Sequence, residues 1–172
     1  MTIKSILIGT VLFSSGLAAM AGQAVAVQGA WARATVPGQK ATGAFMTLTA
    51  AEGSKLVGVE SAVAGVAEVH EMKLEGGIMR MRAVQGGLDL PAGTAVELKP
   101  GGYHVMLMDL KAPVAKDTTV PVTLVFKDAK GVESKVELQL PVSTKPPAGM
   151  AHPKDAKMDH GMHGAMPSKQ TP

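Results

Sequence analysis

Turn residues divide the chain between Val27 and Val142 into short segments rich in Val, Thr, Leu and Met. Glycine and proline groups such as Gly76-Gly77 and Pro100-Gly101-Gly102 recur about every ten residues, and these residues supply the φ angles that tight turns need. No segment keeps a helical period for more than about two turns. The pattern therefore predicts an all-β fold, either an antiparallel β-sandwich or a small Greek-key barrel.

This spacing predicts nine strands in a single folded domain that covers residues 27–144. Each predicted strand is four to ten residues long, as is usual for about 115 residues of β-structure. The expected strands are 27–34, 44–50, 55–61, 67–73, 78–84, 94–98, 103–110, 118–126 and 132–140.

The first 26 residues have the order of a secretory signal. A lysine precedes an apolar run at 6–13, and alanine pairs allow cleavage after Ala21 or Ala26. A membrane anchor is the alternative, but the run falls short of the roughly 20 residues that span a bilayer. We therefore expect a periplasmic protein whose mature chain does not insert into a membrane.

The chain contains no cysteine. An exported protein without cysteine has no disulfide framework, and it cannot build a blue-copper site or a thiolate zinc site. The absence also argues against a bacterial lipoprotein, whose lipid is attached through cysteine. Methionine, with 12 residues, is the one soft metal ligand left.

Charge and aromatic content exclude other classes of function. The formal net charge is only +3, and five aromatic residues are too few for a platform on which bases stack. We therefore expect no nucleic-acid partner. We also expect no enzyme, because only two histidines lie in the predicted domain and neither a Gly-x-Ser-x-Gly motif nor a recognisable carboxylate pair occurs.

Histidine and methionine alternate within two of the predicted strands. Side chains two positions apart share a face of a strand, so His104 and Met106 project together. The same rule places Met81 on the face opposite the neighbouring arginines, which are expected to meet water. With His70 from another strand, these residues form a candidate metal site of two imidazoles and two thioethers, a donor set that favours Cu(I) over hard cations.

Core packing is the plainer explanation for methionine in a strand, and a single His-x-Met pair is weak evidence. We expect Met46 to fill the core, and we favour the same role for Met72, Met79 and Met108. The four candidate ligands stand out because they occur in a cysteine-free, exported chain that also ends in a segment rich in His and Met.

Residues 145–172 contain no Val, Ile, Leu or Phe, so we expect a disordered C-terminal tail. The tail provides a second candidate metal site of low specificity, which can also serve Cu(II). A solvated extension with incidental metal affinity is the alternative. The candidate ligands are His152, His160, His163, Met158, Met162 and Met166.

Several motifs follow one another in a fixed order along the predicted domain. The most specific is Pro100-Gly-Gly-Tyr-His-Val-Met, and the others include Glu68-Val-His-Glu-Met and Gly77-Ile-Met-Arg-Met-Arg. Together these motifs resemble the periplasmic PCuAC copper chaperones. The family motif is a His, ten residues, a Met, a spacer of a little over twenty residues, and His-x-Met. Here ten residues separate His70 from Met81 and 22 separate Met81 from His104.

The resemblance implies a cupredoxin-like β-barrel that holds Cu(I) through His70, Met81, His104 and Met106. It implies a monomeric chaperone that delivers copper to the dinuclear CuA centre of cytochrome c oxidase, or to a thiol-containing copper chaperone. It also implies that the tail holds Cu(II) and cooperates with the folded site. A periplasmic copper-buffering or resistance protein is the alternative, and a β-sandwich adhesion module is a more distant one.

Overall fold

A computed structural model describes residues 25–147; all but the last two residues of the expected signal and nearly all of the expected tail lie outside the described residues. Within this range the structure is all β, and it has no helix long and apolar enough to cross a membrane. The strands are β1 (Val25–Arg33), β2 (Ala41–Ala50), β3 (Ser54–Glu60), β4 (Val66–Glu75), β5 (Ile78–Ala83), β6 (Leu88–Leu90), β7 (Ala95–Leu98), β8 (His104–Met108), β9 (Thr119–Asp128) and β10 (Glu133–Ser143).

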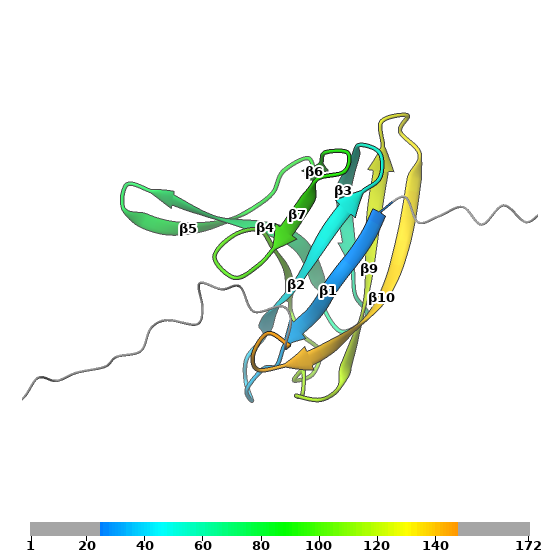
Figure 1. Cartoon of the computed structure of the whole chain (residues 1–172). Helices are drawn as coiled ribbons and strands as arrows, with labels where there is room; N and C mark the ends of the chain where they lie inside the picture. The colour runs from blue at the N-terminus through cyan, green and yellow to red at the C-terminus, as the bar shows by residue number, and fades with distance from the viewer. Residues whose placement is uncertain (1–24, 148–172) are drawn as a thin grey trace, which may run out of the picture.

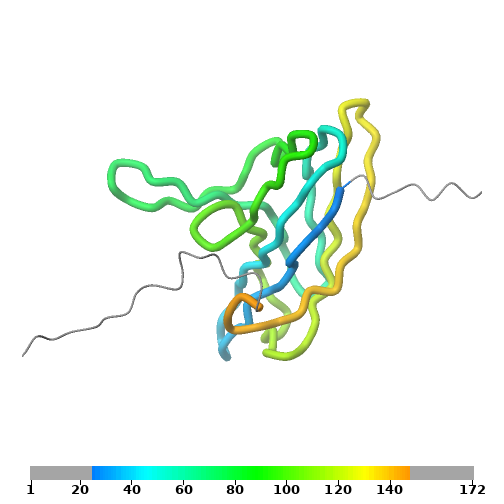
Figure 2. Tube along the Cα trace, viewed as in Figure 1, coloured from blue at the N-terminus to red at the C-terminus, as the bar shows by residue number. Residues whose placement is uncertain are grey.

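The strands run in the order β5-β4-β8-β2-β1-β10-β9-β3-β6, and β7 pairs with β2 (Figure 1). All pairs are antiparallel except β1 with β10, which are parallel and join the two halves of the sheet. The sheet folds over on itself, so that β3 and β9 lie behind β1 and β2 (Figures 1 and 2). The fold is a cupredoxin-like β-sandwich, as the sequence predicted.

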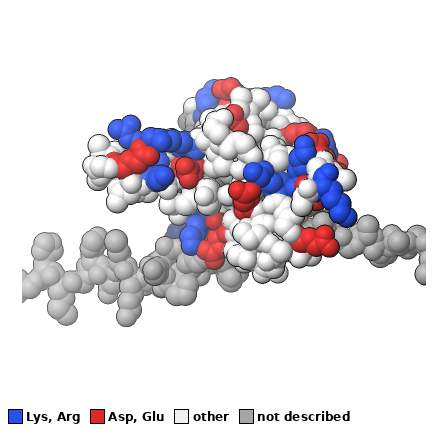
Figure 3. Space-filling model, turned by 90° about the horizontal axis from the view of Figure 1, so that it is seen from above, with Lys and Arg blue, Asp and Glu red and all other residues white. Residues whose placement is uncertain are grey.

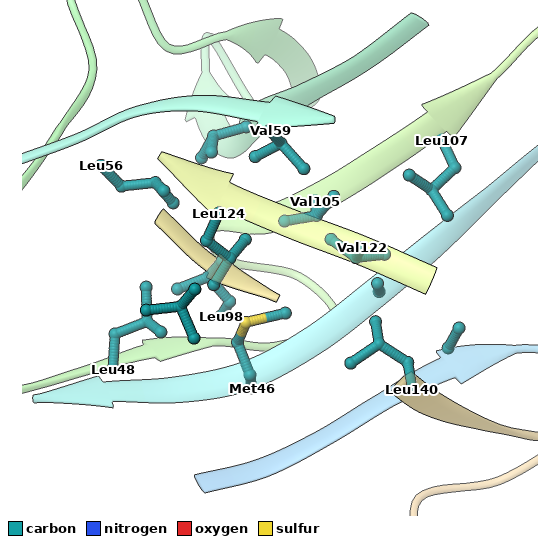
Figure 4. Close-up of a cluster of buried hydrophobic side chains, with 14 of the residues drawn as sticks. Met46, Leu48, Leu56, Val59, Leu98, Val105, Leu107, Val122, Leu124 and Leu140 are labelled. Carbon is teal, nitrogen blue, oxygen red and sulfur yellow. The ribbon is translucent and has the colours of Figure 1, made fainter. Parts of the chain in front are cut away.

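The core lies between the two layers and follows the alternation of the strands. On β2 the buried Met46 and Leu48 face Leu124 of β9 across the interior, and Val105 of the neighbouring strand β8 belongs to the same core (Figure 4). All four side chains are at most 3% exposed. Burial of such side chains is the main stabilising contribution in a domain without disulfides.

A two-stranded ribbon, formed by β4 and β5, projects from the body of the sandwich (Figures 1 and 2). β8 accompanies β4 only from Val66 to His70, and beyond that point β4 pairs with β5. The tight turn at the tip contains Gly76 and Gly77 with φ angles of 57° and 80°, values that favour glycine. Because β8 does not extend along the ribbon, the side chains of the ribbon lie outside the shared core.

The start of β1 bears on the two cleavage positions for the expected signal. Val25 is 1% exposed and belongs to the core, and it pairs with Ala50 of β2. Cleavage after Ala21 leaves this strand whole. Cleavage after Ala26 removes its first two residues.

Each of the nine predicted strands is present, with ends that differ by at most three residues. The additional strand is β6, which has only three residues between two turns. Met46 is buried, as expected, but the favoured core position for Met79 is wrong, because this side chain is 49% exposed on the ribbon. Met72 and Met108 are half-buried.

Candidate metal site

Three neighbouring strands carry the four candidate ligands of the domain. β4 lies between β5 and β8, and its pairing sets His70 directly opposite His104. Met106 follows two positions after His104 on the same face of β8. Because Val69 and Val105 point into the core, the histidines and methionines occupy the outer face of this part of the sheet.

His104 is held in one tautomer by the backbone of the preceding loop. Its Nδ1 donates a hydrogen bond to the carbonyl oxygen of Gly102 at 3.0 Å, since a carbonyl can only accept. The same carbonyl accepts from the backbone N–H of Met72, which ties the loop to β4. Nε2 of His104 is therefore free to offer its lone pair to a metal.

Met81 provides the partner for that nitrogen. Its Sδ lies 3.3 Å from Nε2 of His104, although β4 separates the two strands. With metal–nitrogen and metal–sulfur bonds of about 2.0 and 2.3 Å, as in zinc sites, two ligand atoms of a tetrahedral site lie about 3.5 Å apart. The observed spacing is thus close to one edge of a coordination polyhedron.

His70 is also oriented by a hydrogen bond. Its Nε2 donates to Oε2 of Glu68 at 3.1 Å, and its ring centre lies 6.1 Å from that of His104. Nδ1 of His70 is buried and has no hydrogen-bond partner. An unpaired buried acceptor is costly, so this nitrogen is chemically suited to bind a metal ion.

The four side chains differ in access to solvent. His70 and His104 are 8% and 6% exposed, whereas Met81 on the ribbon is 49% exposed. Met106 is half-buried, opposite Glu68 of β4 and Gly43 of β2. Of the four candidate ligands, Met81 is therefore the most accessible from solvent.

The side chains of this region determine which metal donors are available. Within residues 25–147 no three side chains of the types His, Cys, Asp or Glu lie close enough together to hold a metal ion. Two imidazoles are present, so thioether groups are the remaining side-chain donors. The resulting set is uncharged apart from the hydrogen-bonded carboxylate of Glu68, and it suits a soft monovalent cation.

Two contributors to this region were not singled out by the sequence patterns. Glu68 precedes His70 by two positions and therefore lies on the same face of β4. Strand alternation alone could have identified it as a neighbour of His70. The Gly102 carbonyl is a backbone group and leaves no such signal. Arg80 and Arg82 lie on the exposed opposite face of β5, as expected, where both pair with Glu75.

The candidate ligands in the tail lie outside the described residues, so their arrangement stays a prediction. This holds for His152, His160, His163, Met158, Met162 and Met166.

This chain is similar to a protein family, to a protein of Leifsonia xyli and to several solved structures. The family model "Putative lipoprotein LpqE-like" matches residues 25–142. "Putative lipoprotein Lxx21020" of Leifsonia xyli subsp. xyli is 36% identical over 104 residues, which is 60% of this chain and 63% of that protein. The chain thus spans less than two thirds of the length of this relative.

Among solved structures, the Cu(I) form of DR1885 from Deinococcus radiodurans is 33% identical, with a TM-score of 0.55 over 72% of this chain and 82% of that one. The copper-bound PCuAC domain of PmoF2 is 23% identical, with a TM-score of 0.52 over 70% of this chain and 94% of that one, and it supports the fold alone. The predicted relationship to PCuAC domains is confirmed.

Proposed function

This chain belongs to the LpqE-like family, and from its similarity to DR1885, which has been solved with Cu(I), we propose that it is a copper chaperone which binds Cu(I) and delivers it to another protein. The proposed ligands are two imidazoles and two thioethers of the folded domain. They are His70, Met81, His104 and Met106.

The observation that carries the proposal is the contact between Met81 Sδ and His104 Nε2 at 3.3 Å. A neutral nitrogen lone pair and a thioether sulfur gain little from each other, but together they suit a soft cation. DR1885, which is 33% identical to this chain, has been solved in a Cu(I) form. The donor chemistry and the similarity to DR1885 therefore both support Cu(I) as the bound ion.

The difference in exposure supports transfer. A metal ion held between two buried imidazoles and a half-exposed thioether can be approached from the Met81 side. No thiolate is available to make release slow. An acceptor with cysteine ligands binds Cu(I) more strongly, so it takes the ion by replacing Met81 first and the imidazoles last.

The proposed acceptor is the CuA-bearing subunit of cytochrome c oxidase or a thiol-containing copper chaperone. The lipoprotein description of the family indicates an exported protein. The periplasm is the proposed compartment, with residues 1–26 as the signal. The tail is proposed to bind Cu(II) as a second, looser site.

X-ray absorption on the Cu(I)-loaded protein tests the site. We expect sulfur and nitrogen scatterers in the full chain, and sulfur scatterers that persist after removal of residues 148–172. Loss of all sulfur scattering on truncation would place the methionine ligands in the tail and contradict the proposal.

Transfer to the apo CuA domain of an oxidase tests the function. A chaperone passes Cu(I) to that domain when the two are mixed, and the copper leaves with the acceptor during separation. Retention by this protein would favour a copper-buffering role instead.

A further inference from the structure

The outer face of the β4–β5 ribbon carries three methionines. Met72 and Met81 are direct cross-strand partners, and Met79 lies two positions closer to the turn, opposite Leu74. Cβ atoms of direct partners lie about 4.5–5.5 Å apart, and those of diagonal neighbours about 7–8 Å. Because methionine is long and unbranched, the three sulfur atoms can converge above the ribbon.

Burial in the core does not account for these methionines. Met79 and Met81 are each 49% exposed, and the buried core includes Met46 but none of the three. The opposite face of the ribbon holds Glu75 between Arg80 and Arg82, so charged side chains already cover that side. Figure 3 shows acidic and basic side chains together on the projecting ribbon. An exposed thioether face thus adjoins the His104 site.

We propose that Met72, Met79 and Met81 form a second Cu(I) site made only of thioether sulfur, through which copper enters and leaves the imidazole site. This inference rests on the proposed function, because Met81 belongs to both sites. Three neutral, soft donors select Cu(I) or Ag(I) over hard cations. Without an imidazole, and open to water, the ribbon site binds Cu(I) more weakly than the buried one.

Movement between the two sites is an exchange of ligands around Met81. The bond from Cu(I) to Met81 is kept while the bonds to Met72 and Met79 break. New bonds then form to the Met106 sulfur and to Nε2 of His104 and Nδ1 of His70, the two nitrogens that carry lone pairs in this structure. No electron is transferred and no proton is released.

Methionine methyl NMR distinguishes the two sites in the full-length protein. The chain is labelled with ¹³C at the methionine methyl groups and titrated with Cu(I) without oxygen. We expect the Met81 and Met106 signals to shift first. The Met72 and Met79 signals then shift together, with a further movement of Met81. Zn(II), which thioethers bind poorly, is expected to leave the ribbon signals in place.

A double variant, Met72→Leu with Met79→Leu, keeps the ribbon face apolar and removes two of its sulfur atoms. We expect it to lose the second shift of Met81 and to retain the first, with slower loading of the His104 site. Met108→Leu is the matched control, because Met108 is a half-buried methionine on β8, away from the ribbon. The control is expected to keep both shifts and the normal loading rate.

Two results separate this inference from the proposed function. If Met81 and Met106 shift, but Met72 and Met79 remain unshifted after the tail methionines are saturated, the ribbon site is refuted and the imidazole site stands. If Met106 never shifts while the three ribbon signals do, the proposed His and Met site fails and the thioether site is upheld.

Discussion

The sulfur of Met81 lies 3.3 Å from Nε2 of His104, across the strand that separates them. The two residues are 23 positions apart in sequence, and neither strand pairs with the other. Their meeting depends on β4, which holds β5 on one side and β8 on the other. The proposed coordination therefore depends on three strands, and each of them can be tested separately.

Replacing His104 by alanine removes the nitrogen of this pair. We expect the Kd for Cu(I) to rise by at least about 100-fold, since loss of a ligand costs no less than the 10–100-fold typical of groups behind the ligands. A competition titration with a colorimetric Cu(I) chelator measures the change. Met108→Leu is the control and should bind as the natural protein does; equal affinity in both variants would contradict the site.

Replacing Glu68 by glutamine keeps the size of the side chain and weakens its hold on Nε2 of His70. We expect the Kd for Cu(I) to rise by about tenfold, because the imidazole no longer favours the tautomer with a free Nδ1. Nitrogen NMR of the His70 ring is expected to show a mixture of tautomers. Glu71→Gln, on the other face of β4, should change neither quantity.

Replacing Gly43 by alanine tests the packing of β2 beside Met106. A Cβ atom at this position would lie 2.8 Å from Cζ of Phe45, whose ring packs 4.8 Å from that of Trp31. We expect the free energy of unfolding to fall by about 1–3 kcal/mol, as for other overpacked sites. Denaturation followed by Trp31 fluorescence measures it. Gly53→Ala, with open space around it, is expected to leave stability nearly unchanged.

The expected processing site of the proposed signal follows from the position of β1. Cleavage after Ala21 preserves the buried Val25 and its pairing with Ala50, so we expect the mature protein to begin at Gly22. Intact-mass measurement of the protein purified from the periplasm decides this. A mass that corresponds to cleavage after Ala26 would show that the domain tolerates the loss of this core residue.

Much of the fold was predictable because strand alternation and turn residues are local signals. Gly86-Gly87 and Pro91 mark turns on either side of β6, but three residues are too few to show a period. The side of β5 that carries Met79 and Met81 also followed from alternation. That part of the prediction needed no tertiary information.

Strand order was not predictable in the same way. The pairing of β4 with β8 joins segments far apart in the chain, and it brings His70 opposite His104. The exposure of Met79 has the same cause, because β4 and β5 extend past the end of β8 and leave the core behind. A pattern read along the chain cannot show where a neighbouring strand stops.

The ribbon that projects from the sandwich is only two strands wide, and such a ribbon is marginally stable by itself. A cargo ion bound to Met81 and His104 would act as a brace between it and the body of the protein. On the proposed function, the copper-free protein would have a more flexible ribbon than the copper-bound protein. An acceptor that binds the ribbon would then distinguish the two forms by this flexibility, before any ligand is exchanged.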